Sequence, residues 1–336
     1  MDNTTKTVLV AGAGAWGTAL AIALARNGHT VMIWGRNSEH LRQLQTERCN
    51  KRYLPAASFP DNLQAIVSLE TLADPIDDIV MAVPCAGLAA AVTTLAENAD
   101  LQRTGLCLAC KGLADDGIRL NHEVVADIAG SVPIAVLSGP SFAAELANGM
   151  PTAVTIAADD VDHVDHLQQL FHGDTLRIYT HDDVIGVEIG GAIKNVMAIA
   201  AGIADGLGLG ANTRTALITR GLAEIMRLGV ALGGRTATFM GLAGLGDLVL
   251  TATDDQSRNR RFGLALGRGE SPATASEAIG QVIEGARTAR ATLALAERHG
   301  ISMPITEQVV AVVDGSRSPM QAVQALLNRD PKAEQD

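Results

Sequence analysis

Short apolar runs alternate with segments of helical character through the first half of the chain. The first run, Thr7–Ala11, is mostly β-branched and aliphatic and predicts a strand buried on both faces. The alanine-rich segment 18–25 follows it and has high helix propensity. Further strands are predicted at 29–34, 78–83, 106–110, 133–137, 153–157 and 176–179, and a helix at 142–147. This order predicts an α/β domain built on a doubly wound parallel sheet.

From about residue 184 onward the pattern is helical. Arg220, Glu224 and Arg227 fall at i, i+4 and i+7, which places a polar stripe on an otherwise apolar segment. Near the end, the sequence Ser-Pro-Met-Gln at 318–321 has capping-box spacing with proline at N1, and predicts a last helix. We therefore expect an N-terminal domain at 1–185, an all-helical domain at 186–330 and a polar tail at 331–336.

Six residues between the first strand and the first helix, Gly12-Ala-Gly-Ala-Trp-Gly17, have the spacing GxGxxG. Gly12 would allow the tight turn, Gly14 would let the backbone approach a pyrophosphate, and Gly17 would let the helix lie close to the strand. With 34 glycines in the chain, an ordinary glycine-rich turn is the alternative. The position between a strand and a helix favours a dinucleotide site in a Rossmann-type domain.

The end of the second predicted strand bears on the choice of dinucleotide. Many NAD sites have an acid here for the ribose hydroxyls, whereas a nearby arginine accommodates a 2′-phosphate. This chain has Gly35-Arg36-Asn37, with no acid before Glu39. We therefore expect a preference for NADP(H), with NAD(H) also used; the alternative is that Arg36 is an ordinary surface charge.

Composition narrows the class of protein. The 336 residues suggest two domains, and 47% hydrophobic with only 3% aromatic residues means a core of Ala, Leu, Val and Ile. A net charge of −11 disfavours nucleic acid and membrane surfaces as partners. Glycines interrupt the apolar N-terminal stretch and only Lys6 precedes it as a cation, so it does not resemble a secretory signal. We expect a cytoplasmic protein without membrane insertion.

Two groups of residues have metal-like spacing, and we expect neither to bind a metal. Cys107 and Cys110 lie in a predicted strand, where residues three apart point to opposite faces, so buried thiols are expected rather than a metal or redox pair. His163 and His166 stand among aspartates in a polar stretch, which favours a solvent-facing helix.

The segment Gly190-Gly-Ala-Ile-Lys-Asn195 is the first candidate for chemistry in the helical half. Two glycines in a helix cost about 1 kcal/mol each relative to alanine, so they need a reason. They lie one turn below Lys194 and Asn195 and would admit a ligand or another backbone there. A lysine kept dry can serve as general acid or base. The alternative is tight helix packing with Lys194 on the rim.

Two later stretches complete the candidates. The glycine-rich segment 241–247 is expected to be flexible and ends in Asp247. The run at 256–261, Gln-Ser-Arg-Asn-Arg-Arg, stands out in an acidic chain, and its donors suit a phosphate. A solvated basic run is the alternative. In the first half, Lys111 and Ser141 follow predicted strands, at the edge of a parallel sheet where ligands bind.

With these segments in view, the sequence closely resembles the bacterial glycerol-3-phosphate dehydrogenases that use NAD(P). The resemblance runs over essentially the whole chain. Its blocks are the glycine loop with 18–21, Lys111-Gly112, Ser138-Gly-Pro-Ser-Phe142, Gly190-Gly-Ala-Ile-Lys-Asn-Val196, Asn212-Thr-Arg-Thr-Ala-Leu-Ile218, Gly241-Leu-Ala-Gly-Leu-Gly-Asp247, Ser257-Arg-Asn-Arg-Arg-Phe262 and Val282-Ile-Glu-Gly285.

The resemblance implies an enzyme that interconverts dihydroxyacetone phosphate and sn-glycerol 3-phosphate for glycerophospholipid synthesis, without a metal. Lys194 matches the family's catalytic lysine. The positions that match substrate contacts are Lys111, Gly139, Ser141, Asp247, Ser257, Arg258 and Asn259. The positions expected at the cofactor are Gly12, Gly14, Ala15, Trp16, Gly17, Arg36, Lys111, Ala143, Arg258, Val282 and Glu284. Ala15 is a departure, because many members have serine there, and we expect a small effect.

Two other functions stay open at this point. A related hydroxy-acid dehydrogenase of the same architecture could use Arg258 for a substrate carboxylate. A non-catalytic dinucleotide sensor would bind the cofactor without turnover, and the lysine and arginine candidates argue against it. The Ala- and Leu-rich helical half could also bury the face of a homodimer.

Overall fold

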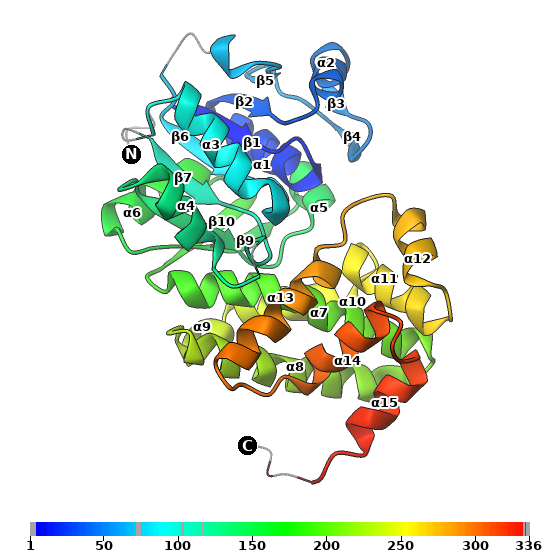
Figure 1. Ribbon diagram of the computed structural model, residues 1–336. Coiled ribbons are helices and arrows are strands. Elements are labelled where there is room, and N and C mark those ends of the chain that lie inside the picture. Colours follow the sequence, from blue (N-terminus) through cyan, green and yellow to red (C-terminus); the bar gives the residue numbers. More distant parts are fainter. Residues whose placement is uncertain (1–4, 72–74, 102–103, 116, 332, 334–336) are drawn as a thin grey trace.

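The computed structural model describes residues 5–71, 75–101, 104–115, 117–331 and 333. A sheet-containing half and a helical half lie against each other, the first drawn in blue to green and the second in green to red (Figure 1). The last strand of the sheet ends at His181, and the first helix of the helical half begins at Val184. Most of the predicted polar tail at 331–336 lies outside the described residues.

The sheet has eight strands in the described part of the chain, in the order β10-β9-β8-β7-β6-β1-β2-β5. Neighbouring strands are parallel except for β8 and β9, which are antiparallel. The strands are β1 Thr7–Ala11, β2 Thr30–Trp34, β5 Leu63–Ala65, β6 Asp78–Met81, β7 Gly105–Leu108, β8 Ile134–Ser138, β9 Thr152–Ala158 and β10 Leu176–His181.

The sheet departs from the parallel arrangement at one junction, between β8 and β9. A parallel neighbour needs a crossover that carries the chain back along the whole sheet, usually by a helix. Between β8 and β9 the chain has only α5, Ala143–Ala147, which is too short for that return. The chain turns at the carboxyl end of β8 and runs back beside it, and the predicted doubly wound α/β class is otherwise confirmed.

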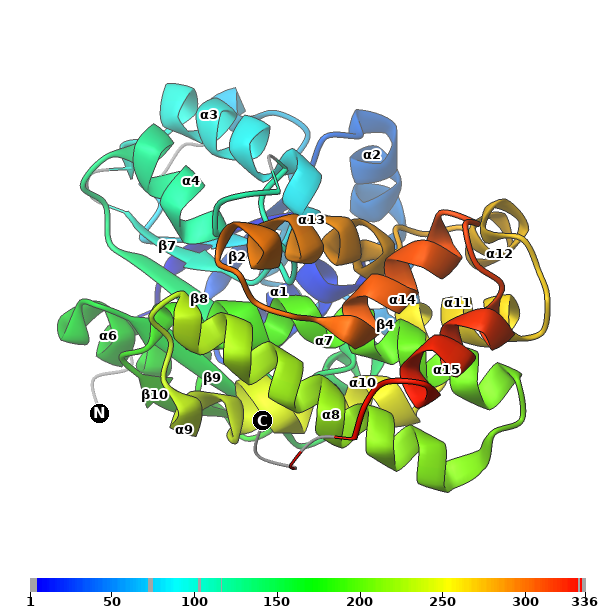
Figure 2. The same ribbon diagram turned by 60° about the horizontal axis from the view of Figure 1, so that its bottom comes forward.

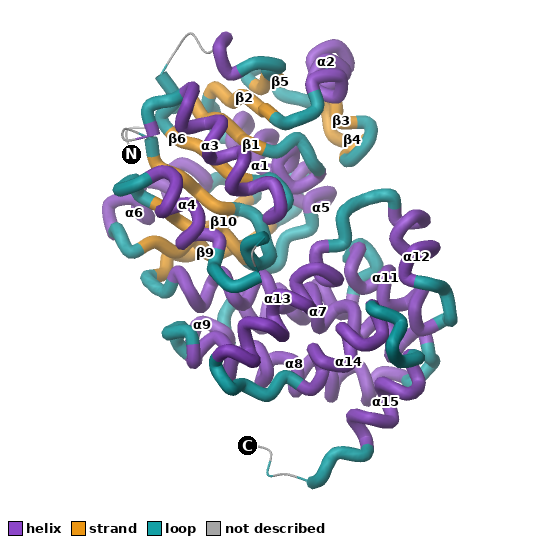
Figure 3. Tube along the Cα trace, viewed as in Figure 1, coloured by secondary structure: helices purple, strands orange, loops and turns teal. Residues whose placement is uncertain are grey.

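Both faces of the sheet are buried, as the continuous apolar strands predict. In β1, Val8 and Val10 join one core cluster and Leu9 joins the other. The helices of this half are α1 Ala15–Arg26, α2 Ser38–Glu47, α3 Leu88–Asn98, α4 Asn121–Ala129, α5 and α6 Val161–Phe171, and a small hairpin pairs β3 Cys49–Asn50 with β4 Leu54–Ser58. In Figure 3 the strands, drawn in orange, lie in this half, and the other half is drawn as purple helices joined by teal loops.

The helical half is organised around α7, Val184–Gly206, most of which is buried. Figure 2 shows α13 and α7 along the boundary with the sheet, and α8 beyond them. The other elements are α8 Gly210–Ala231, α9 Thr236–Phe239, the π-helical turn η4 Leu242–Gly246, α10 Asp247–Thr253, α11 Arg258–Gly267, α12 Pro272–Ile279, α13 Glu284–Arg298, α14 Pro304–Val313 and α15 Pro319–Leu327. The predicted capping box opens α15, where Ser318 and Gln321 bond reciprocally.

Glycines bring α7 and α11 unusually close. A Cβ at Gly202 of α7 would overlap the carbonyl oxygen of Arg260 and lie 3.0 Å from the Cα of Gly263. One turn later, a Cβ at Gly206 would lie 2.9 Å from the Cα of Gly267. The two glycine pairs therefore place the backbones of these helices in direct contact and set the position of α11.

Two stretches, 184–206 and 236–253, are long and apolar enough to cross a membrane by length and composition alone. In the first, 94% of the apolar window is buried inside the protein, so its composition is that of a core helix. The second comprises α9, η4 and α10, and 44% of its window is buried.

The two groups with metal-like spacing have different surroundings. Cys107 and Cys110 belong to core clusters on opposite faces of the sheet, as expected for buried thiols. The prediction that these histidines face solvent is wrong for His163, whereas 38% of the His166 side chain is exposed. His163 is buried, and His166 Nε2 lies 2.8 Å from the buried Asp78 carboxylate, because α6 turns this face toward the amino end of the sheet. Among the described residues there is no group of three or more potential metal ligands.

Candidate active site

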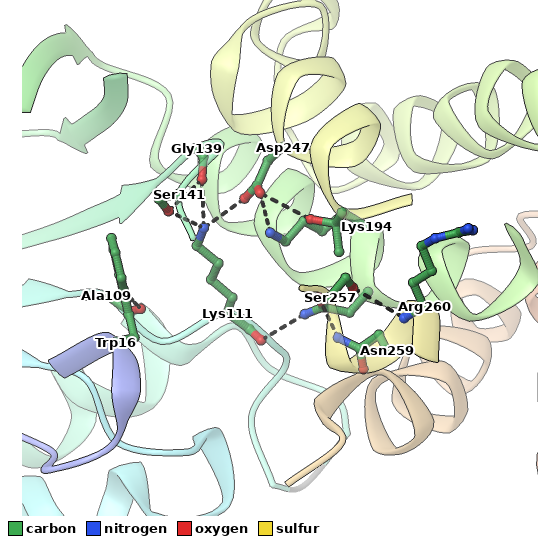
Figure 4. Close-up of polar contacts among 12 residues, drawn as sticks. Trp16, Ala109, Lys111, Gly139, Ser141, Lys194, Asp247, Ser257, Asn259 and Arg260 are labelled. Carbon is green, nitrogen blue, oxygen red and sulfur yellow. Dashed lines mark hydrogen bonds and ion pairs between the residues drawn. The ribbon is translucent and has the colours of Figure 1, made fainter. Parts of the chain in front are cut away.

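Charged side chains from both halves meet where β7 and β8 end against α7 and α10 (Figure 4). Lys111 stands three residues beyond β7, and Gly139 and Ser141 follow β8. Lys194 comes from the middle of α7 and Asp247 opens α10. The structure thus brings together five residues that the sequence analysis singled out separately.

One buried carboxylate binds both lysines. Asp247 Oδ2 accepts a hydrogen bond from Lys111 Nζ at 2.8 Å, and Asp247 Oδ1 accepts one from Lys194 Nζ. Thr251, one turn along α10, places its hydroxyl 3.4 Å from the same Oδ1. Asp247 is fully buried and Lys194 is only 6% exposed.

The surroundings of Lys194 lower its pKa to about 7. Burial is the largest cause, because it penalises the charged ammonium form. The Lys111 ammonium lowers the pKa further, and Asp247 opposes both effects. Lys194 is therefore a group that gives up and takes back a proton near neutral pH.

Lys111 connects this pair to the glycine loop. Besides Asp247, its Nζ donates to the Gly139 carbonyl oxygen at 2.8 Å and to Ser141 Oγ at 3.2 Å. The same nitrogen lies 5.6 Å from the ring centre of Trp16, within cation–π range. Trp16 is held by a 3.1 Å hydrogen bond from its Nε1 to the Ala109 carbonyl oxygen (Figure 4).

The two glycines of α7 serve helix packing, and Lys194 is nevertheless not on a rim. A Cβ at Gly190 would lie 2.6 Å from the Ala243 carbonyl oxygen in η4, and one at Gly191 would overlap Ser138 Oγ. Their absence lets α7 lie directly against η4 and the end of β8. This close approach buries Lys194 beside Asp247 instead of leaving it in solvent.

The segment 241–247 was expected to be flexible, and it is ordered. Leu242–Gly246 forms a π-helical turn with Ala243 and Gly244 buried, and α10 follows without a break. The turn is packed against Gly190, which explains why glycine and alanine are needed there. Such turns often occur at functional sites, and this one delivers Asp247 to the lysines.

The run at 256–261 is neither a solvated basic run nor a uniform set of phosphate ligands. Arg260 is buried and pairs with Asp205 and Asp255, while Arg261 is exposed. Arg258 is partly buried, which lowers its pKa, and its Nη1 donates to Gln281 Oε1 at 3.2 Å. Among the described residues neither Arg258 nor Arg261 forms an ion pair, and of these two only Arg258 is partly buried.

The neighbours of Arg258 have structural partners. Ser257 caps α11, with Oγ accepting from the Arg260 N–H at 3.2 Å. Asn259 Nδ2 donates to Asn195 Oδ1 at 2.9 Å, and its Oδ1 accepts from the Gly285 N–H at 2.9 Å. Asn195 in turn donates to the Lys111 carbonyl oxygen at 3.4 Å. Asn195 and Thr251 were not among the predicted site residues, although Asn195 stands one turn after Gly191.

The glycine loop fits a dinucleotide. Gly12 has φ +131°, and a Cβ on it would lie 2.5 Å from the Ala82 carbonyl group. A Cβ at Gly17 would overlap the Gly12 carbonyl oxygen, so helix and strand touch there. A Cβ at Gly14 would meet nothing within 4 Å, and no side chain or acid caps α1. The N-terminus of α1, with Ala15 first, therefore faces an open space suited to a pyrophosphate.

The other expected cofactor residues are more scattered. Arg36 is exposed just after β2, and Ala143 opens α5. Glu284 opens α13 and approaches Gly112, and burial raises its pKa. Val282 is 53% exposed.

Comparison with known proteins gives matches over the whole chain. Models of the NAD-dependent glycerol-3-phosphate dehydrogenase N-terminus and C-terminus match residues 7–164 and 183–324. The chain is 49% identical to a glycerol-3-phosphate dehydrogenase [NAD(P)+] of Yersinia pestis over 337 aligned positions, 99% of each protein.

Solved structures agree with this. A glycerol-3-phosphate dehydrogenase from Coxiella burnetii superposes with a TM-score of 0.93 at 48% identity, covering 97% of this chain and 99% of the other. A glycerol-3-phosphate dehydrogenase from Saccharomyces cerevisiae superposes with a TM-score of 0.80 at 27% identity, covering 96% and 99%.

Proposed function

The chain belongs to the NAD-dependent glycerol-3-phosphate dehydrogenase family, and we propose that Lys194 is the general acid–base and Arg258 the phosphate ligand of its reaction. The protein is an NAD(P)-dependent oxidoreductase that acts on a CH–OH group, interconverting dihydroxyacetone phosphate and sn-glycerol 3-phosphate. This reaction supplies the glycerol phosphate of phospholipids. The observation that carries the residue assignment is the buried Lys194–Asp247–Lys111 cluster. Within it, the pKa of Lys194 is lowered to about 7.

Lys194 acts at the ketone oxygen. Reduction of a ketone turns its oxygen into an alkoxide, and a protonated lysine beside that oxygen neutralises the developing charge by giving its proton. In the reverse direction, the neutral amine removes the proton from the alcohol. A group with a pKa of about 7 is suited to both roles at neutral pH.

Asp247 and Lys111 support this proton transfer. Asp247 holds the Lys194 amine in place from one carboxylate oxygen and Lys111 from the other. Lys111 also reaches Gly139 and Ser141, so we propose that it contacts substrate together with them and with Asn259 and Ser257. Arg258 supplies a partly buried guanidinium for the phosphate, whose recognition fixes the carbonyl relative to Lys194.

Most of the residues that we assign to the cofactor belong to the first half of the chain. NAD(P)H supplies the hydride for the ketone carbon when it is bound. The open N-terminus of α1 at Gly14 and Ala15 suits its pyrophosphate. We propose that Trp16, Ala143, Val282 and Glu284 also contact the cofactor, and that Arg36 favours NADP(H) over NAD(H). We also propose a cytoplasmic location, on the basis of composition and charge, and a homodimer.

Full-length relatives carry the glycerol-3-phosphate dehydrogenase name, so a hydroxy-acid dehydrogenase is not favoured. The direct test is NADPH oxidation, followed by absorbance, with dihydroxyacetone phosphate beside its unphosphorylated form and a keto acid. We expect turnover with the phosphorylated ketone alone.

Lys194→Ala should lower kcat by about 10²- to 10⁴-fold and leave the Kd for NADPH nearly unchanged. A Lys194→Ala enzyme with ordinary turnover would remove the lysine from the mechanism.

A further inference from the structure

Besides Asp247 of α10, the structure has a buried carboxylate on α7, Glu188, which takes no part in the proton transfer. It is 4% exposed. Its Oε1 accepts a hydrogen bond from the N–H of Asn121, the first residue of α4, and its Oε2 lies 2.7 Å from His122 Nδ1. Glu188 thus caps the N-terminus of a helix of the sheet-containing half from a helix of the other half.

Asn121 connects this cap to the active site. Its Nδ2 donates to the Gly112 carbonyl oxygen at 2.7 Å and also lies 3.6 Å from Cys85 Sγ. Gly112 directly follows Lys111 and is closely packed, because a Cβ on it would lie 2.9 Å from Cys85 Sγ. The backbone that carries Lys111 is therefore held at Gly112 through Asn121.

One face of α7 follows this backbone. Glu188, Gly191 and Asn195 are spaced i, i+3 and i+7 and lie on the same side of the helix. A Cβ on Gly191 would lie 3.8 Å from Lys111 Cγ, and Asn195 donates to the Lys111 carbonyl oxygen. In Figure 4 a dashed line ends on the Lys111 carbonyl oxygen, beside the Lys111–Asp247–Lys194 cluster. The helix that supplies the proton donor therefore also contacts Lys111, at its carbonyl oxygen through Asn195 and beside its side chain at Gly191.

We propose that Glu188 is a positioning residue for the reaction, which acts through Asn121 and Gly112 to keep the Lys111 ammonium on Asp247. This inference rests on the proposed role of Lys194. If the main chain at Gly112 shifts, Lys111 Nζ leaves its 2.8 Å contact with Asp247 Oδ2. Asp247 then serves Lys194 alone.

Displacement of Lys111 would change the electrostatic surroundings of Lys194 as well as the geometry of the site. The charged groups that face Lys194 are Asp247 of α10, which raises its pKa, and Lys111, which lowers it. Removing Lys111 from the cluster therefore raises the pKa of Lys194. Around Glu188 the titratable groups are His122 of α4 and Cys110, and His122 also faces Glu123 and Asp159. Burial alone would lower the pKa of His122, but Glu188 raises it above its ordinary value, which favours an ion pair.

The chain offers a matched control in Glu224 of α8. This carboxylate is 2% exposed and caps α14, accepting from the N–H groups of Ile305 at 2.6 Å and Thr306 at 3.2 Å. Glu188→Ala and Glu224→Ala each remove a buried carboxylate that caps another helix, so both lower the thermal unfolding midpoint. We expect only Glu188→Ala to lower kcat with dihydroxyacetone phosphate and NADPH, by about 10- to 100-fold.

The pH profile separates positioning from loss of stability. In Glu188→Ala, the pH at which kcat for ketone reduction falls to half moves upward, because the pKa of Lys194 rises. Glu224→Ala keeps the wild-type profile. Glu188→Gln keeps an acceptor for the Asn121 N–H and recovers most of the lost activity.

Asn121→Ala tests the same connection and leaves the cap intact. The substitution removes the side-chain hydrogen bond to the Gly112 carbonyl oxygen, while the main-chain N–H of residue 121 still donates to Glu188. It should reproduce the shift of the pH profile even if Glu188→Ala does not fold. The double variant should be no slower than the slower single one. An unshifted profile in folded Glu188→Ala or Asn121→Ala, or an equal shift in Glu224→Ala, overturns the proposal. A wild-type protein inactive with dihydroxyacetone phosphate would contradict the proposed function instead.

Discussion

Two lysines, Lys111 and Lys194, pair with the same carboxylate, Asp247, so the site has two ammonium groups for one buried anion. Asp247 is fully buried and cannot neutralise Lys111 and Lys194 together. Lys111 is the more exposed of the two, with 15% of its side chain accessible against 7% for Lys194. Burial lowers the pKa of Lys194, the more deeply buried of the two, which supports its proposed role as the proton carrier.

The pH dependence of the two directions follows from that pKa. Ketone reduction needs protonated Lys194, so its kcat should fall as pH rises through about 7. Alcohol oxidation needs the neutral amine, so its kcat should rise through the same range. Steady-state rates between pH 5.5 and 9 measure both limbs. Asp247→Asn removes the anion that raises the Lys194 pKa and should move both limbs to lower pH; limbs that stay in place would contradict this account.

At the scale of elements, glycines decide how the helices that carry the site meet. Gly190 and Gly191 set α7 against η4 and β8, and the glycine pairs between α7 and α11 bring the start of α11, with Arg258, toward the site. The first pair is unusual in the sequence itself, because it interrupts a helix beside a lysine, whereas nothing in the sequence assigns a role to Gly202, Gly206, Gly263 or Gly267. Their partner residues lie on another helix, so their spacing along one helix did not reveal the contact.

Gly202→Ala should lower the free energy of unfolding by about 1–3 kcal/mol, because the new methyl group overlaps the Arg260 carbonyl oxygen and α11 must move away. Gly87→Ala is the control, since a Cβ at Gly87 meets nothing within 4 Å and its φ is negative. Urea unfolding of the two variants and the wild type gives the comparison. Equal midpoints for Gly202→Ala and the wild type would mean that α11 can move to accommodate the methyl group without loss of stability.

Elements also account for what the sequence pattern described incorrectly. Glu224 was placed in a polar stripe of α8, and the structure buries it as the cap of α14. His163 was expected in solvent, and it is buried with its Nε2 3.5 Å from the carbonyl oxygen of Leu106 in β7. In both cases a polar residue faces a second element that supplies its partner. Helical periodicity identifies a face of a helix but not what covers it.

At the scale of the whole molecule, the two halves divide the work. Arg36 lies after β2 in the sheet-containing half, and Arg258 opens α11 in the helical half. Arg258→Ala should raise the KM for dihydroxyacetone phosphate by about 10- to 100-fold and leave the ratio of NADPH to NADH efficiency unchanged. Arg36→Ala should lower kcat/KM for NADPH and leave that for NADH nearly unchanged.

Steady-state kinetics with both cofactors measure these effects. A wild-type enzyme that prefers NADH would contradict the expected role of Arg36. An unchanged KM in Arg258→Ala would place the phosphate elsewhere. The two results are independent: the first would not affect the assignment of Arg258, and the second would not affect that of Arg36.

The sequence by itself determined the features that depend on near neighbours in the chain. These are the apolar strands, the glycine turn before α1, the capping box of α15 and the separation into an α/β half and a helical half. Residue types within a few positions specify each of them through backbone sterics, periodicity and local hydrogen bonds. The resemblance to a family added the candidate residues but not their surroundings.

Only the tertiary structure decided which of those residues act together. Asp247 meets Lys194 across 53 positions of sequence and Lys111 across 136. It also decided that β9 turns back, that Arg260 is structural and that Glu188 reaches α4. A lysine's pKa depends on burial and on charges a few ångströms away, and both are set when distant segments pack together.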